Sequence, residues 1–238
     1  MHAAGSLREV LSEVAKRWQA QGGAPVVLTF GASGLLRERI ETGEISHLFA
    51  CADTTHPQRL ADTGGWQAPL VFARNALCAI VQPAITVDTD SLLALLLNDD
   101  IRLGTSTPGA DPSGDYVWAL FRLADQMCPG AFAALDAKAL KLTGGAESIQ
   151  PPAGRGTYAW IMDDGQADVF LTYRTVARSV QREVPRLKIV QLPAALQIGV
   201  AYGLTVRSDA PAAVHRLAEF VRLPEARAVF ARLGFGPP

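Results

Sequence analysis

Residues 25–43 read PVVLTFGASGLLRERIETG, and this stretch gives the first indication of the fold. Residues 25–30 are rich in β-branched side chains and are typical of a strand. The turn Gly31-Ala32-Ser33-Gly34 then leads into a helix expected at about residues 35–42, which Gly43 ends. We therefore expect a strand that passes through a turn of small residues directly into a helix.

The same pattern surrounds this stretch. Upstream, the turn Ala3-Ala4-Gly5 precedes a helix over roughly the first 20 residues, in which apolar residues recur at helical spacing. Ser6 and Glu9 are spaced as a capping box at the start of that helix. Downstream, residues 47–52 are typical of a short strand. The resulting β-α-β order predicts a parallel sheet.

The rest of the chain continues the alternation. We expect further strands at residues 70–81, 101–104, 169–173, 187–192 and 198–206. We expect further helices at residues 114–126, 157–164, 212–221 and 224–233. The sequence therefore predicts an α/β fold.

Composition excludes several classes of protein. The 238 residues carry 22 Lys and Arg against 23 Asp and Glu, a net charge of −1 that lacks the basic excess of a nucleic-acid binder. The longest apolar stretches are far below the roughly 18 residues of a membrane helix. The 3 Cys and 4 His show no metal-ligand spacing, so we expect no metal ion, no disulfide scaffold and no cofactor.

Four turns place a hydroxyl where a helix begins: at Ser6, Ser33, Ser113 and Thr157. A helix N-terminus presents unpaired N–H groups and the positive end of the helix dipole. In an open α/β sheet such turns gather at the carboxyl ends of the strands, where ligands bind. The pattern indicates an anion site without Lys or Arg. The alternative is that these residues only cap their helices, since Ser and Thr are among the best N-caps.

Enzyme motifs are missing from the chain. It contains no phosphate-binding P-loop and no dinucleotide-binding glycine pattern. The turn at Ser33 departs from the hydrolase nucleophile elbow because Leu35 stands where the last glycine belongs. A Ser33–His215 hydrolase is conceivable, but His215 lies within a helical apolar pattern. We therefore expect no catalytic residues and no enzyme activity.

Several blocks of the sequence resemble the molybdate-binding proteins of ABC importers. The blocks are Ala3-Ala4-Gly5-Ser6-Leu7, residues 30–36 with 40–43 and 48–53, residues 167–173, and the C-terminal segments 218–220, 224–226 and 230–235. They occur in the family's order and span nearly the whole chain. This resemblance implies a bilobed periplasmic-binding-protein fold of the type with two hinge crossovers. It places lobe one at residues 1–80 and 197–238 and lobe two at residues 81–196, with hinges near residues 77–81 and 196–200.

The resemblance also implies a ligand and a partner. The ligand would be molybdate or tungstate, held in the cleft between the lobes by Ser6 and Ser33 from lobe one and by Ser113, Thr157 and Tyr173 from lobe two. A periplasmic monomer would deliver it to an ABC permease in the membrane. Fully deprotonated oxyanions offer only acceptors, which suits a site made of donors. Sulfate, phosphate or an organic anion is the alternative ligand.

The chain departs from the family's pattern in two places. Four charges lie near the expected site, at Asp111, Asp115, Arg155 and Arg174, and they either face solvent or mark a larger or protonated anion. Only Met1-His2 precede Ala3, so we expect the first strand to be nearly absent and the secretory segment to be missing from a chain that starts late.

Two other functions use related architectures. An effector-sensing module like those of LysR-type regulators would need a DNA-binding helix-turn-helix before the first turn. An enzyme like porphobilinogen deaminase would need a cofactor-bearing Cys in the cleft, and Cys51 and Cys128 lie outside the predicted turns. We therefore expect a solute-binding protein.

Overall fold

The structure, a computed structural model, describes residues 1–238 and contains two compact lobes, each with its own five-stranded sheet. Lobe one comprises Met1–Asn75 and Val200–Pro238, and lobe two comprises Ala76–Gly199. The chain therefore passes between the lobes after Asn75 and again after Gly199. None of the helices has the length and apolar character needed to cross a membrane.

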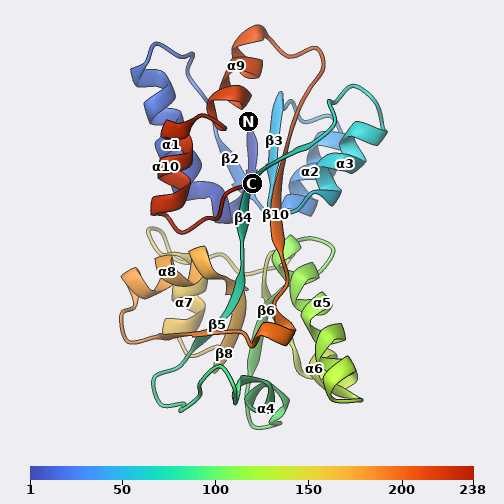
Figure 1. Ribbon diagram of the computed structural model, residues 1–238, viewed down its shortest axis with the longest axis vertical. Helices are drawn as coiled ribbons and strands as arrows, with labels where there is room; N and C mark the ends of the chain where they lie inside the picture. The colour runs from blue at the N-terminus through green and yellow to red at the C-terminus, as the bar shows by residue number, and fades with distance from the viewer. The chain divides into compact units, whose positions relative to one another are not determined.

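Lobe one is built on a mixed sheet with the strand order β2-β1-β3-β10-β4. Its strands are β1 (His2–Ala4), β2 (Thr29–Gly31), β3 (Leu48–Cys51), β4 (Leu70–Asn75) and β10 (Val200–Val206). Its helices are η1 (Gly5–Leu7), α1 (Arg8–Ala20), α2 (Ser33–Glu41), α3 (Thr55–Asp62), α9 (Ala212–Phe220) and α10 (Pro224–Arg232). Strands β1, β2 and β3 are parallel, and β10 is antiparallel to β3 and β4. Helices α1 and α10 cover one face of this sheet, and α2 and α3 cover the other (Figure 1).

The first strand is present, contrary to the expectation from the sequence. β1 is only 3 residues long, yet it pairs with β2 on one side and with β3 on the other, and all three of its residues are buried. Its shortness also explains why β2 is confined to Thr29–Gly31 rather than the expected residues 25–30. An edge strand gains ladder hydrogen bonds only where its neighbour runs beside it; the last such bonds join Met1 to Val27 and Thr29, and the Val27 side chain is 80% exposed.

The expected capping box at Ser6 and Glu9 is wrong. The chain leaves β1 through the 3₁₀ turn η1, and Ser6 lies inside that turn. Helix α1 then begins at Arg8 after Leu7, with no capping hydrogen bond from a side chain. A 3₁₀ turn shares its last residue with the start of the helix, which leaves no separate N-cap position for Ser6.

Lobe two is built on a second mixed sheet with the order β7-β6-β8-β5-β9. Its strands are β5 (Leu77–Val81), β6 (Leu103–Ser106), β7 (Leu140–Thr143), β8 (Val169–Tyr173) and β9 (Lys188–Gln191). Its helices are α4 (Leu92–Leu97), α5 (Pro112–Met127), α6 (Ala131–Lys138), α7 (Thr157–Asp163), α8 (Arg174–Glu183) and η2 (Ala194–Leu196). Strands β6, β7 and β8 are parallel, and β5 is antiparallel to β8 and β9. Helices α7 and α8 pack against this sheet around Ile161, Phe170 and Ala177, and α5 and α6 lie on its other side (Figure 1).

Two strands differ from their expected positions. Residues 70–81 form β4 and β5 in different sheets, because the chain changes lobes at Asn75 and Ala76 in the middle of one apolar run. Strand β6 runs from Leu103 to Ser106, two residues later in the sequence than the expected 101–104. Helices α3, α4, α6 and α8 and strand β7 were not predicted from the sequence.

Candidate ligand-binding site

Ser6 lies at the carboxyl end of β1, inside the turn η1. Its hydroxyl is 3.1 Å from the phenol oxygen of Tyr202 on β10. The amide of Asn75, the last residue of β4, donates to the same phenol oxygen at 3.2 Å. Ser6 is therefore linked through a buried tyrosine to β10 and β4, on the other side of the lobe-one sheet.

Ser33 lies at the carboxyl end of β2 as the first residue of α2 and is 1% exposed. Its hydroxyl accepts a long hydrogen bond of 3.4 Å from the backbone N–H of Ala52, which follows β3. Burial raises the pKa of the adjacent Cys51 thiol, and the Asp53 carboxylate adds to the rise, while a hydrogen bond from Ser33 acts against it. Ser6 and Ser33 thus lie at the same edge of the lobe-one sheet, at the ends of neighbouring parallel strands.

Ser113 lies in lobe two as the second residue of α5, and none of it is exposed. Its hydroxyl oxygen is fully buried and has no hydrogen-bond partner. Its backbone N–H donates to Asp111, which caps the helix, at 3.0 Å. A buried hydroxyl without a partner costs free energy, on the order of 1–3 kcal/mol, so the Ser113 side chain calls for an explanation beyond packing.

Thr157 and Tyr173 belong to the same edge of the lobe-two sheet. Thr157 is the partly buried first residue of α7. Tyr173 is the last residue of β8 and is 1% exposed. Its ring packs edge-to-face against Tyr116 of α5, with ring centres 6.3 Å apart. The structure therefore brings Ser113, Thr157 and Tyr173 to the carboxyl ends of parallel strands in lobe two.

A hydroxyl cluster in lobe two was not predicted from the sequence. We define it as Ser106, Ser113, Tyr158 and Thr172. The phenol oxygen of Tyr158 on α7 is 3.0 Å from the hydroxyl of Ser106 at the end of β6. Burial raises the pKa of Tyr158 and the charge of Asp111 adds to the rise, while the hydroxyls of Ser106, Thr172 and Ser113 act against it. The phenol has only one proton to donate, and the buried hydroxyls of Thr172 and Ser113 are left without a hydrogen bond of normal geometry.

The capping alternative is wrong for the four hydroxyl residues. The N-cap positions of η1, α2 and α7 are occupied by Ala4, Ala32 and Gly156, and none of them is capped by a side chain. In α5 the cap is the Asp111 carboxylate. Ser33, Ser113 and Thr157 instead stand inside the first turn of their helices. Their side chains are therefore not used to satisfy the helix ends.

The four charges near the expected site have different surroundings. Asp111 caps α5, and Asp115 accepts a hydrogen bond from the Gly109 N–H at 2.8 Å, so both acids hold the loop before α5. Arg155 is held by Glu183 at 2.6 Å and by Asp163 at 2.8 Å. Arg174 follows Tyr173 directly, and its Nε is buried without a hydrogen-bond partner. Three of the four charges are therefore engaged within lobe two.

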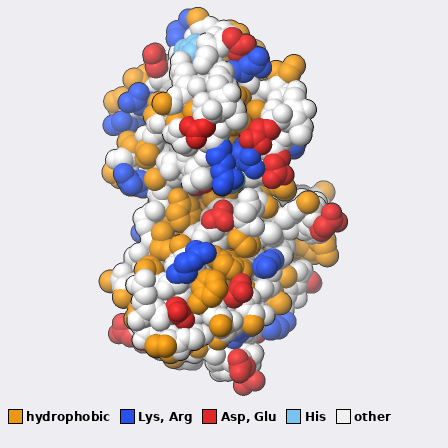
Figure 2. All heavy atoms as spheres, turned by 90° about the vertical axis from the view of Figure 1, so that its right-hand side faces the viewer, with side chains coloured by type: hydrophobic (Ala, Val, Ile, Leu, Met, Phe, Trp, Pro, Cys, Tyr) orange, Lys and Arg blue, Asp and Glu red, His pale blue; other side chains and the backbone are white.

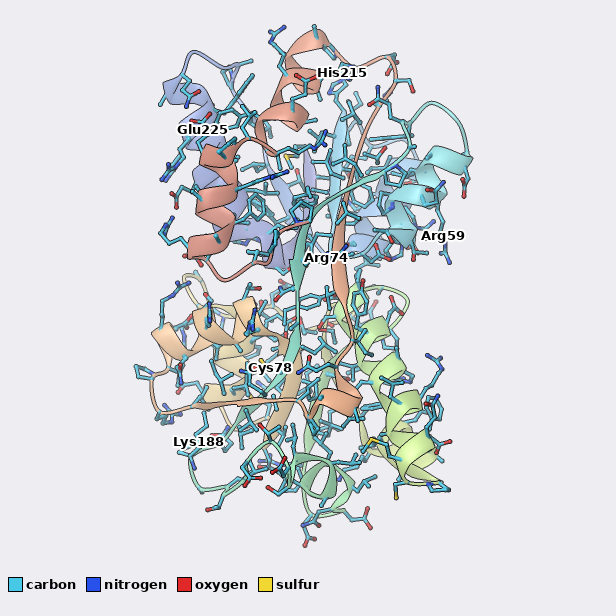
Figure 3. The ribbon with its side chains drawn as sticks, viewed as in Figure 1. Arg59, Arg74, Cys78, Lys188, His215 and Glu225 are labelled. Atoms are coloured by element: carbon cyan, nitrogen blue, oxygen red, sulfur yellow. The ribbon has the colours of Figure 1, made fainter.

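His215 does not form a catalytic pair with Ser33. It is a partly exposed residue of α9, as the label in Figure 3 shows. The hydrogen-bonding neighbours of Ser33 are Ala52 and Cys51. Cys51 and Cys78 are buried and Cys128 is exposed. Basic and acidic side chains are interspersed over the face of the molecule drawn in Figure 2, as the near-zero net charge leads one to expect.

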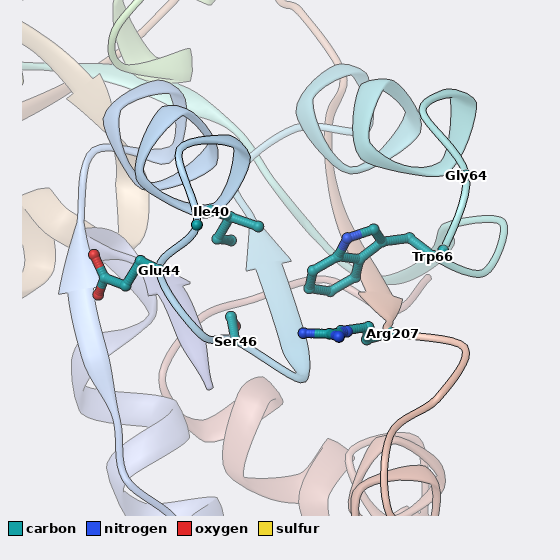
Figure 4. A pocket seen from close by; sticks show the side chains of 8 residues that line it. Ile40, Glu44, Ser46, Gly64, Trp66 and Arg207 are labelled. Carbon is teal, nitrogen blue, oxygen red and sulfur yellow. The ribbon is translucent and has the colours of Figure 1, made fainter.

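A pocket of about 270 Å³ lies at the opposite edge of the lobe-one sheet. Figure 4 shows the Arg207 side chain extending beneath the ring of Trp66 toward Ser46. The two charged side chains that line this pocket are already paired: Arg207 binds Asp209 at 2.7 Å, and Glu44 binds Arg39 at 2.5 Å. Ser46 precedes β3, so this pocket is at the amino ends of the parallel strands, away from Ser6 and Ser33.

Sequence reasoning missed five polar residues of these two regions: Asn75, Ser106, Tyr158, Thr172 and Tyr202. The signal for Ser106 was lost because β6 was expected to end two residues early. Tyr158 and Thr172 are next in sequence to the expected site residues Thr157 and Tyr173. A sequence motif does not tell which of two adjacent residues faces the site. Tyr202 and Asn75 belong to strands, where a polar group at a buried position is the only indication that the sequence offers.

The family model described as bacterial extracellular solute-binding protein matches residues 1–236. The chain is 36% identical over 203 residues to the uncharacterized protein PM1146 of Pasteurella multocida (strain Pm70), which covers 85% of this chain and 84% of that protein.

Solved structures of low identity share the fold. The sulfate-binding protein SubI from Mycobacterium tuberculosis H37Rv has a TM-score of 0.81 at 20% identity, over 99% of this chain and 85% of that one. The periplasmic molybdate-binding protein of Azotobacter vinelandii has a TM-score of 0.73 at 19% identity, over 100% and 98%. PEB3 bound to L-phospholactate has a TM-score of 0.76 at 14% identity, over 100% and 98%. The chain thus has the α/β two-lobed periplasmic-binding-protein fold.

These findings confirm the expected fold class and the expectation of a binding protein rather than an enzyme. The family model covers all but the last two residues of the 238, and it is the broader solute-binding family rather than the molybdate group alone. The protein therefore belongs to the bacterial extracellular solute-binding protein family.

Proposed function

We propose that the solute which this protein binds for an ABC transporter is an anion with a tetrahedral oxyanion group, of which molybdate and tungstate are the simplest examples. Ser6 and Ser33 of lobe one and Ser113, Thr157 and Tyr173 of lobe two are the proposed ligand contacts. The protein binds its solute without transforming it, as the family does.

The observation that carries the proposal is the buried hydroxyl of Ser113, which has no partner although it stands in the first turn of a 16-residue helix. A native hydroxyl without a partner is rare and calls for a missing ligand, water or ion. The first turn of a helix favours an anion, because its N–H groups are unpaired and the dipole is positive there. The buried Ser33 in the first turn of α2 has the same position in lobe one.

Sulfate, phosphate or an organic anion that carries such a group satisfies the same donors. SubI and the Azotobacter protein are named for sulfate and for molybdate, and PEB3 was crystallised with L-phospholactate, so oxyanion groups recur among the structural neighbours. At 14% to 20% identity, their likeness to this chain is one of fold. We propose delivery to a membrane permease by a monomer from the periplasm.

Thermal unfolding tests the proposal. The protein is heated with molybdate, tungstate, sulfate or phosphate, each at about 1 mM, and with sodium chloride of equal ionic strength as the control. A ligand present at about 1,000 times its Kd stabilises by roughly 4 kcal/mol, which raises the Tm by roughly 8–16 °C for a chain of this size. Ser33→Ala and Ser113→Ala are each expected to reduce that increase. The oxyanion assignment is wrong if neither these salts nor an organic phosphate raises the Tm beyond the chloride control.

A further inference from the structure

Three buried polar atoms without hydrogen-bond partners occur at the carboxyl end of β8 and beside it. They are the hydroxyls of Ser113 and Thr172 and the Nε of Arg174. Thr172 is the second-last residue of β8, and Arg174 is the first residue after the strand. The two buried hydroxyls are donors for one oxyanion group, and the Arg174 guanidinium is then available to a second group of the ligand.

Arg174 differs from the other arginines of this region. Arg155 is held by Glu183 and Asp163, and Arg102 is held by Asp168 at 2.6 Å. Arg174 has no carboxylate partner in the structure, although part of its guanidinium is shielded from water. A positive charge is also unfavourable at the first position of a helix, where the dipole is positive. Its place at the start of α8 therefore needs a compensating negative charge.

The position of Arg174 relative to the hydroxyl cluster follows from Cys78. In the β5–β8 ladder Cys78 pairs with Thr172, so their side chains leave the same face of the sheet. Burial raises the pKa of Cys78 to about 12, and the charges of Arg174 and then Arg178 act against the rise. The Arg174 charge therefore acts on Cys78, the cross-strand neighbour of Thr172, on the face that also carries Tyr158 of α7.

We propose that the solute carries a second anionic group, such as a carboxylate, which Arg174 binds while the proposed ligand contacts, Ser113 among them, bind the tetrahedral group. This inference rests on the proposed oxyanion function and narrows it to an organic anion with two charged groups. A guanidinium offers two parallel N–H donors to a carboxylate, and such bidentate pairs are among the stronger hydrogen bonds in proteins. The free Nε is one of the donors that this arrangement uses.

The test compares two probes that differ by one group. Methyl phosphate carries the tetrahedral group alone, and 2-phosphoglycolate adds a carboxylate. Their Kd values are measured by titration calorimetry on the full chain. We expect the wild-type protein to bind 2-phosphoglycolate about 10- to 100-fold more tightly, the range for hydrogen bonds to a charged group. Arg174→Gln should remove that advantage and leave the Kd of methyl phosphate unchanged.

Two further variants complete the test. Arg178→Gln, one turn later on the exposed side of α8, is the matched control and should behave as the wild type. Arg174→Lys keeps the charge and serves if Arg174→Gln does not fold; it should keep part of the advantage because it lacks the two parallel donors.

The outcomes separate the two proposals. Equal affinity of the wild type for both probes, or an advantage that persists in Arg174→Gln, overturns the role of Arg174. If molybdate binds while neither organic probe does, the oxyanion function stands and the second anionic group is wrong. If no anion binds at all, the oxyanion function fails, and this inference fails with it.

Discussion

Ser6 and Tyr202 are joined through their hydroxyl oxygens at 3.1 Å, although 196 positions separate them in the sequence. The Asn75 amide donates to the same phenol oxygen at 3.2 Å and so occupies one of its two lone pairs. Either hydroxyl of the Ser6–Tyr202 pair can be the donor. Where the phenol donates, the Ser6 proton is left for another acceptor, and an anion is such an acceptor.

The first prediction concerns Tyr202→Phe. This change removes the oxygen that Ser6 and Asn75 share and should lower the free energy of unfolding by about 1 kcal/mol, the usual value for a buried hydrogen bond. It should also weaken binding of the stabilising anion several-fold, because Ser6 is no longer oriented. Urea unfolding and calorimetry measure the two effects. In a double-mutant cycle with Ser6→Ala, strictly additive losses would show that the two residues act independently.

The second prediction separates binding from stability at Ser113. The Ser113 hydroxyl makes no hydrogen bond of normal geometry, so Ser113→Ala removes a buried polar group at little cost in hydrogen bonds. The unliganded protein should be as stable as the wild type or up to about 1 kcal/mol more stable, while anion affinity falls about 10-fold or more.

Thr105→Val is the matched control for Ser113→Ala. Thr105 is a fully buried residue of the neighbouring β6 whose hydroxyl donates to the Leu140 carbonyl at 3.3 Å. This change should lower stability by about 0.5–1 kcal/mol and leave affinity unchanged. A loss of stability in Ser113→Ala with normal binding would give Ser113 a structural role instead.

The third prediction concerns Gly114, the residue after Ser113. A β-carbon there would lie 2.5 Å from the Pro108 nitrogen and 2.7 Å from the Ser106 carbonyl oxygen, both backbone atoms that cannot swing away. Helix propensity alone favours alanine over glycine by about 1 kcal/mol. We nevertheless expect Gly114→Ala to cost about 2 kcal/mol or more, since α5 must move away from β6.

The same change should weaken anion binding, because Ser113 moves with α5. Ala119→Gly in the middle of α5 provides the comparison, with the ordinary cost of about 1 kcal/mol and normal affinity. If Gly114→Ala proves stabilising, the close approach of α5 to β6 is not present in solution. Thermal unfolding and calorimetry measure both variants.

The fourth prediction is a pH dependence. Arg102 binds both carboxylate oxygens of Asp168, at 2.6 and 3.0 Å, and joins the starts of β6 and β8. Its side-chain hydrogen bonds hold the pKa of Asp168 below the ordinary value. A lowered folded-state pKa means that the stabilisation is present above the unfolded pKa of about 3.9 and is lost as the pH falls through the folded value.

Asp168→Asn should therefore be less stable than the wild type by about 1 kcal/mol at neutral pH, and the difference should shrink below about pH 4. Asp209→Asn, which removes the exposed partner of Arg207, is the control and should change stability little at any pH. A difference for Asp168→Asn that stays constant down to about pH 2 contradicts the assignment. Urea unfolding at each pH provides the measurement.

The sequence predicted elements best where one segment contains its own signal. Strand β8 lies at the expected residues 169–173, because five apolar or β-branched residues are bounded by Asp168 and a helix start. The expected starts of α5 and α7 lie within two residues of those found, because Pro112 and Gly156 mark them. The α/β class followed from this alternation.

Elements that depend on a distant partner were not predicted correctly. The length of β2 is set by its neighbour β1, and the break between β4 and β5 is set by the change of lobe; neither leaves a local mark in the sequence. The same holds for the site. Hydroxyls at helix starts were visible, but the hydroxyl cluster and the Tyr202–Ser6 contact form only when separate strands lie side by side.

The pairing of Asn75 with Val200 has a practical consequence. These residues end β4 and begin β10, and they face each other in the antiparallel ladder of lobe one. Everything between them, Ala76–Gly199, is lobe two. An Asn-Gly turn inserted in its place would convert β4 and β10 into an ordinary hairpin. Lobe two is thus one continuous segment inserted at the tip of a hairpin. A single insertion or deletion in the gene is therefore enough to add or remove the whole lobe.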